Sequence, residues 1–271
     1  MKFVLTFFIL LSCGDNQFAS LTEPDPAVNA SKHLEDQKPD SAIEVLLDAL
    51  GGGFKAIFNS VTVNSNLTEV EVSLRDELNR IKPSKPEAPN WVSILASAQA
   101  QKAGIDILLI VLELAKGESE ESSASTTGST TTGSEFEKLF PVLPAGTTEN
   151  SFNLGFAITL LASIGSETLT KADNFKQGIF LTSRTALFIK SVDKDGDGVV
   201  SPLEVLDIND SSAEDIVDTL TQAIATIDAA GIGSGSRSET SANQIEEIKK
   251  QIEESEGETL GDKLRNFIIA K

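Results

Sequence analysis

The sequence predicts an all-α fold, with two helical regions joined by a Ser/Thr-rich linker. Apolar residues recur at the three- and four-residue spacing of amphipathic helices through most of the chain. Strict alternation of apolar and polar residues between turn signals, which would indicate strands, is scarce. Residues 117–134 are nearly pure Ser, Thr, Gly and Glu, and this composition cannot bury enough apolar surface to fold.

The N-terminus, residues 1–14, is predicted to be a secretion signal. One positive charge precedes about ten apolar residues, too few to cross a bilayer. Ser12 and Gly14 are small residues suited to cleavage after Gly14, and a cut near Ala19 is another option. The tetrapeptide ending at Cys13 instead resembles a bacterial lipoprotein box. The protein is therefore expected to be secreted and extracellular or, as the alternative, lipid-anchored through Cys13.

Residues 15–40 are polar, acidic and interrupted by prolines, so they are predicted to form a flexible N-terminal segment. The N-terminal helical region follows at residues 41–116. Asp106 and Glu113 lie in its most apolar stretch, which favours a buried core helix over a transmembrane span. The region is expected to contain four helices, over residues 43–50, 54–61, 68–81 and 91–116.

The C-terminal helical region comprises residues 135–271. A strongly apolar helix is predicted from Phe152 to Ile164, and a longer one from about Lys171 to Val192. Further apolar groups with helical spacing predict three more helices, around residues 216–224, 245–252 and 260–268.

Residues 193–204 read DKDGDGVVSPLE and predict a calcium site. Calcium takes about six to eight oxygen ligands at about 2.3–2.6 Å, and a loop of this length can supply them from alternating positions. Gly198 can take the positive φ that turns the chain sharply in the middle of the loop. Ser201 and Glu204 around Pro202 are also typical of a helix start with a capping box. The expected metal ligands are Asp193, Asp195, Asp197, the carbonyl of Val199, Ser201 through a water, and both oxygens of Glu204.

This loop resembles the EF-hand calcium-binding family at every consensus position, and Ile189 and Val192 stand where the family places apolar residues of the incoming helix. The resemblance implies that the cofactor is Ca²⁺. EF-hands usually occur in pairs, and residues 228–239 repeat Asp228 at the first position and Glu239 at the twelfth. The third and fifth positions there lack ligating side chains, so this segment is either a degenerate second hand or a plain loop between helices.

The composition argues against an enzyme. The chain has one His, one Cys and no Tyr, so few side chains suit acid/base or nucleophilic work near neutral pH. His33 is predicted to be solvated, and no zinc site can be built around a single His and a single Cys. A net charge of −19 would repel phosphate backbones, so no nucleic-acid partner is expected, and cations are the natural partners.

The sequence therefore predicts a secreted, non-enzymatic calcium-binding protein with a structural or extracellular-matrix role. Its acidity and Ser/Thr-rich segment are similar to those of secreted EF-hand proteins of biomineral (shell) organic matrix, which would make matrix components its partners. Two alternatives are a membrane-anchored bacterial lipoprotein with a calcium-stabilised helical domain and a calcium-responsive module that binds a protein partner. Sequons that could carry glycans stand at Asn29, Asn66 and Asn209.

Overall fold

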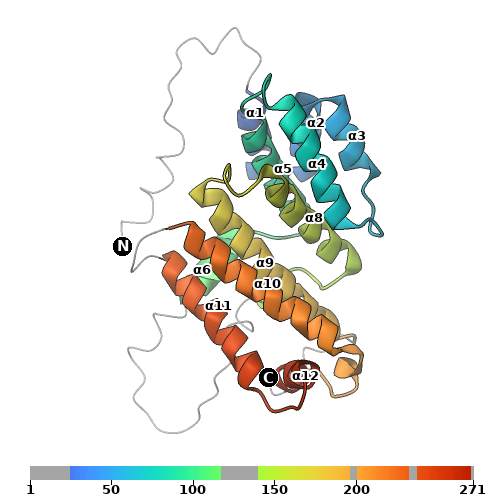
Figure 1. The fold of residues 1–271 in the computed structure, drawn as a ribbon, viewed down its shortest axis with the longest axis vertical. Coiled ribbons are helices and arrows are strands. Elements are labelled where there is room, and N and C mark those ends of the chain that lie inside the picture. The colour runs from blue at the N-terminus through green and yellow to red at the C-terminus, as the bar shows by residue number, and fades with distance from the viewer. Residues whose placement is uncertain (1–24, 117–139, 196–199, 232–236, 270–271) are drawn as a thin grey trace.

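The structure is a computed structural model that describes residues 25–116, 140–195, 200–231 and 237–269. Within these ranges it contains eleven α-helices, two 3-10 helices and no strand, which confirms the predicted all-α fold (Figure 1). None of the helices in the described ranges is both long enough and apolar enough to cross a membrane. The predicted signal (residues 1–14) and linker (residues 117–134) lie outside the described residues.

Three of the predicted N-terminal helices correspond to α2 (Pro39–Leu50), α3 (Gly52–Ser60) and α4 (Leu67–Ile81). Gly51 separates α2 from α3, and its φ of 98° is one that only glycine adopts readily. Helix α4 begins at Leu67, one residue before the predicted start at Thr68, because Asn66 caps it. Asn66 accepts the Thr68 N–H at 3.1 Å and donates to Glu69 at 3.0 Å. The N-terminal helices are α1 (Pro26–Glu35), α2 (Pro39–Leu50), α3 (Gly52–Ser60), α4 (Leu67–Ile81) and α5 (Ala88–Lys102).

Helix α1 lies within the segment that was expected to be flexible. Asp25 caps the helix by accepting the Ala27 N–H at 2.8 Å, and Pro26 occupies the first helical position, where its missing N–H costs nothing. Pro39 likewise occupies the first turn of α2, although no side chain caps that helix. The helix packs on α2 and α5, and His33 within it is half-buried, with a buried Nδ1 that has no hydrogen-bond partner. Two of the prolines in this segment, Pro26 and Pro39, are therefore helix starts. His33 is half-buried and is not simply solvated.

The predicted helix over residues 91–116 is divided into α5 and α6 (Ile107–Lys116). Gly104 lies between them with a φ of 79°, and an added Cβ would stand 3.0 Å from Pro144. Asp106 accepts the N–H groups of Leu108 and Leu109 at 3.0 and 3.2 Å, so it caps α6 instead of lying inside a longer helix. The break redirects the chain before the segment that leads to the C-terminal helices.

The helices on either side of residues 117–139 share one core. Helix α8 packs against α4 and α5 and also against α9, as Figure 1 shows. Leu95 of α5, Leu154 of α8 and Leu187 of α9 are all fully buried in the same apolar cluster. The C-terminal helices are α8 (Thr148–Ile164), α9 (Lys171–Val192), α10 (Asp210–Ala229), α11 (Arg237–Glu254) and α12 (Leu260–Ile269), with the 3-10 helices η2 (Phe140–Val142) and η3 (Glu204–Asp207).

Helices α9 and α10 run side by side in opposite directions (Figure 1). Lys171 at the start of α9 donates to the carbonyl of Gly231, just beyond the end of α10, at 3.4 Å. Gly178 of α9 faces Ile227 and the Ala223 carbonyl so closely that an added Cβ would lie 2.4 and 3.0 Å from them. This antiparallel packing places the predicted calcium loop at the opposite end of the pair, where α9 ends and the chain turns back toward α10.

Two of the three sequon asparagines cap helices. Asn66 caps α4, and Asn209 caps α10 by accepting the Ser212 N–H at 2.9 Å. The third, Asn29, lies within α1. Asparagine is a favoured N-cap residue, so this structural role accounts for two of the sequons, and glycan attachment stays a prediction.

Candidate metal centre

Three of the predicted calcium ligands come together where α9 ends. Asp193, Asp195 and Glu204 each offer one carboxylate oxygen, and these oxygens lie within 4.8 Å of one another. Two ligands on opposite sides of one calcium ion lie about 5 Å apart, twice the calcium–oxygen distance. The three oxygens are therefore close enough that they could hold one metal ion. Asp197 and Val199, the third aspartate and the carbonyl ligand of the prediction, lie outside the described residues.

Glu204 joins the two ends of the loop. Its Oε1 accepts the Lys194 N–H at 2.6 Å and the Asp195 N–H at 3.4 Å, while its Oε2 accepts the Ser201 N–H at 2.8 Å. These bonds favour the charged carboxylate, and those from the Ser201 backbone, the Ser201 hydroxyl and the Lys194 backbone lower the pKa of Glu204 to about 2. Glu204 is therefore ionised at any physiological pH and is held over the loop.

Ser201 supports Glu204. Its hydroxyl donates to Glu204 Oε2 at 2.9 Å, and its carbonyl accepts the Glu204 N–H at 3.1 Å. The predicted capping box is present in part, because the Glu204 carboxylate returns to the Ser201 N–H but the serine hydroxyl does not accept the Glu204 N–H. The structure thus shows Ser201 as a residue that positions the twelfth-position carboxylate.

The chain that leaves the loop forms only a short turn where the sequence predicts the start of a helix. It forms only η3 and ends that turn at Ile208, after which Asn209 caps α10. Val205 and Ile208 are buried and hold the short turn against the core. The acidic loop therefore connects two antiparallel helices that pack along their length, α9 and α10.

The second candidate loop does not lie beside the first. Asp228 is in the last turn of α10 and Glu239 is within α11, so helices occupy both ends of the twelve-residue segment 228–239. Gly231 contacts Lys171 at the start of α9, whereas Asp193 follows the end of that helix. A helix of 22 residues is about 33 Å long, and this length separates the two segments. The arrangement departs from the side-by-side pairing that the repeat suggested.

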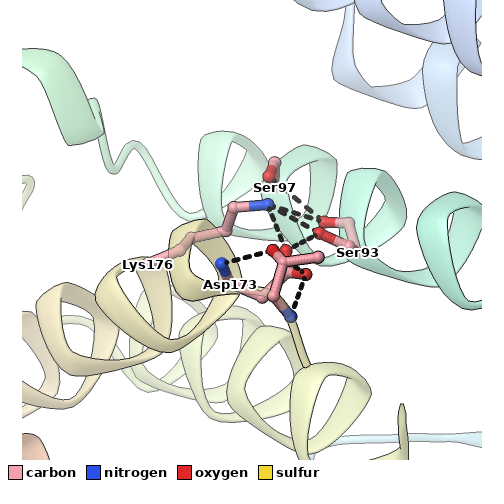
Figure 2. A network of polar contacts seen from close by, with 5 residues as sticks. Ser93, Ser97, Asp173 and Lys176 are labelled. Carbon is pink, nitrogen blue, oxygen red and sulfur yellow. Dashed lines mark hydrogen bonds and ion pairs between the residues drawn. The ribbon is translucent and has the colours of Figure 1, made fainter. Parts of the chain in front are cut away.

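A second polar cluster, which the sequence analysis missed, joins α5 to the first turns of α9 (Figure 2). The Lys176 ammonium donates to the Ser93 hydroxyl at 2.8 Å and lies 3.4 Å from Asp173. The Ser93 hydroxyl donates to Asp173 Oδ1, and Thr170 Oγ1 donates to Asp173 Oδ2 at 2.7 Å. The spacing of Thr170 and Asp173 is a capping-box signal, but nothing local in the sequence indicates that Ser93, 80 residues away, meets them.

The charges in this cluster stabilise each other. Burial raises the pKa of Asp173, but hydrogen bonds from Ser93 and Thr170 and the charge of Lys176 outweigh burial and lower it overall. Burial lowers the pKa of Lys176, and Asp173 opposes that shift. The Ser93 hydroxyl donates a hydrogen bond to Asp173 and accepts one from Lys176, so the lysine is not placed to activate the serine as a base. The geometry supports a structural ion pair.

The fold and the loop together define an all-α protein with an acidic group that could hold a metal ion. A comparison of this chain with known protein families, with curated proteins and with solved structures finds no match. The function therefore has to be argued from the residues of the chain itself.

Proposed function

We propose that this protein binds calcium at the loop of residues 193–204 and has no enzymatic activity. The observation that carries the proposal is the convergence of Asp193, Asp195 and Glu204, whose carboxylate oxygens lie within 4.8 Å of one another. All three are hard, anionic oxygen donors, the type that calcium prefers. The EF-hand-like order of Asp, Gly and Glu in the loop adds independent support from the sequence.

The irregular arrangement of a short acidic loop suits calcium better than a cation that needs a tight octahedron. Calcium accepts irregular geometry and bidentate carboxylates, whereas magnesium demands near-ideal geometry at about 2.0–2.1 Å and keeps several waters. Glu204 is already oriented by the Lys194 and Ser201 N–H groups, so little conformational freedom is lost when it binds an ion. Asp197 and the Val199 carbonyl would complete the ligand set, as the sequence predicts.

The proposed setting is extracellular, where calcium modules have dissociation constants of about 10⁻⁴ to 10⁻³ M. Calcium at tenfold its dissociation constant would stabilise the fold by about 1.4 kcal/mol, which suits a structural or matrix protein. The alternative is a lipoprotein anchored through Cys13. Mass spectrometry of the mature N-terminus separates the two, because secretion after Gly14 leaves Asp15 at the N-terminus and lipidation leaves a diacylated Cys13.

Replacing Glu204 with Gln tests the site. We expect calorimetric titration of the mature protein to show one calcium site, and Glu204→Gln to weaken it at least about tenfold, or about 1.4 kcal/mol. The amide removes the charge from the twelfth-position ligand and places a donor against the N–H groups of Lys194 and Ser201. Glu246→Gln, an exposed change on α11, is the matched control and should bind like the unmodified chain. Equal calcium affinity in the two variants would show that the loop is not the site.

A further inference from the structure

Two leucines beside the candidate metal centre face solvent. Leu203 is 78% exposed and Leu206 is 63% exposed. In the sequence, Leu203 precedes Glu204 and Leu206 follows it by two residues. Leu203 is the N-cap of η3 and has helical backbone angles, and Leu206 lies three residues further on within η3. Because side chains three apart on such a turn lie on one face, we infer that the two leucines form one small apolar surface. Val205 and Ile208 are 2% and 4% exposed and fix the turn to the core. The leucines are therefore presented to solvent by an anchored turn.

Carboxylates border this apolar surface. Glu204 lies between the leucines in sequence and belongs to the acidic group with Asp193 and Asp195, and Asp207 follows Leu206. The Lys194 ammonium lies 2.6 Å from Asp207 and offsets one of these charges. The border stays negative, on a chain whose net charge is −19. Such a surface attracts a partner that is both apolar and basic, and it repels anionic membranes and nucleic acids.

We propose that Leu203 and Leu206, with the bordering carboxylates of Glu204 and Asp207, form a docking face for a basic amphipathic helix of a partner protein. The apolar side of such a helix covers the leucines, while its lysines or arginines pair with the carboxylates. The proposal concerns the same loop as the calcium site but does not rest on calcium binding. If calcium does occupy the loop, it reduces the local negative charge and lowers the affinity for the partner helix. By linkage, the bound partner lowers the affinity for calcium by the same factor.

Fluorescence anisotropy with a labelled amphipathic helical peptide of leucine and lysine tests the docking face. The full chain is titrated first in EDTA, and we expect the double variant Leu203→Ser/Leu206→Ser to bind at least about tenfold more weakly than the unmodified chain. Leu108→Ser is the matched control, because Leu108 is an exposed leucine on α6 and should leave binding unchanged. Both leucines of the double variant are exposed, and a circular dichroism spectrum like that of the unmodified chain confirms that the fold is kept.

The outcomes separate this proposal from the calcium site. Binding by the double variant as tight as by the unmodified chain would overturn the docking face, because the attraction would then come from overall charge. Absence of binding to the unmodified chain would also overturn it. Leucine-dependent binding that weakens when calcium is added supports both proposals. Leucine-dependent binding that calcium leaves unchanged supports the docking face and counts against calcium in the loop.

Discussion

At Asp173 the balance between burial and charge can be followed contact by contact. The side chains of Asp173 and Lys176 are only 12% and 19% exposed, so ionising them inside the fold carries a desolvation cost. Hydrogen bonds from Ser93 and Thr170 offset that cost for the carboxylate. Burial lowers the pKa of Lys176, and the carboxylate of Asp173 opposes that shift. Removing one partner of such a pair is costly, because the other charge is left buried and alone.

We therefore expect Asp173→Asn to lower the free energy of unfolding by about 3 kcal/mol at neutral pH. The pKa of Asp173 is lowered in the folded state from an ordinary value of 3.8, so its stabilisation is complete above that pH and is lost as the pH falls through the lower, folded value. The difference between the unmodified chain and the variant should narrow below pH 3.8. Urea denaturation at neutral and acidic pH measures this.

Asp218→Asn, an exposed change on α10, is the control for Asp173→Asn and should alter stability by less than about 0.5 kcal/mol. A difference for Asp173→Asn that stays constant across the acidic range would show that its charge does not carry the effect.

At the scale of elements, α9 and α10 approach each other closely at Gly178. An added Cβ would lie 2.4 Å from Ile227 and 3.0 Å from the Ala223 carbonyl, which is backbone and cannot rotate away. Gly178→Ala raises helix propensity by about 1 kcal/mol, but overpacking costs about 1–3 kcal/mol. The two effects together predict that the variant is destabilised by up to about 2 kcal/mol in thermal or urea denaturation.

Gly52→Ala provides the comparison for this packing argument. Gly52 begins α3, and nothing lies within 4 Å of the position of an added Cβ. The same substitution should there be neutral or stabilising by up to about 1 kcal/mol. If the two alanine variants had the same free energy of unfolding, the predicted clash of a Cβ at Gly178 with α10 would be wrong.

Most helices of this fold can be predicted from sequence because their apolar spacing is a local property. The boundaries that were predicted wrongly depend on capping and backbone conformation. Pro26 begins a helix because Asp25 caps it, and Gly104 ends one because it adopts a positive φ. Both residue types also occur in loops, and only the neighbouring contacts decide between the two outcomes.

For the candidate site too, contacts within one short segment can be predicted from sequence, and contacts made by packing across the fold cannot. Asp193, Asp195 and Glu204 belong to one short segment, so their convergence follows from loop spacing. Ser93 and Asp173 meet only through packing across 80 residues, and no local pattern indicates that contact. The sequence likewise shows a repeat at residues 228–239, but the antiparallel packing of α9 and α10 decides that it lies far from the first loop.

For the whole molecule, the continuous core predicts one cooperative unfolding transition. Helix α8 connects the N-terminal helices to α9, and the buried apolar residues form a single cluster. Trp91, the only tryptophan, is buried in α5 and reports on the N-terminal helices by fluorescence, whereas circular dichroism reports on all helices. We expect the two signals to change at the same urea concentration. Two separate midpoints would show that the regions on either side of residues 117–139 unfold independently.

Helix α9 carries a charged group at each end, and its length has an electrostatic consequence. Asp173 and Lys176 lie in its first turns and Asp193 follows its last, so about 30 Å of helix separates them. The Debye length at physiological ionic strength is about 8 Å, so the electrostatic interaction between the two charged groups is largely screened. Substitutions at the two ends also share no partner, and their free energies should simply add in a combined variant.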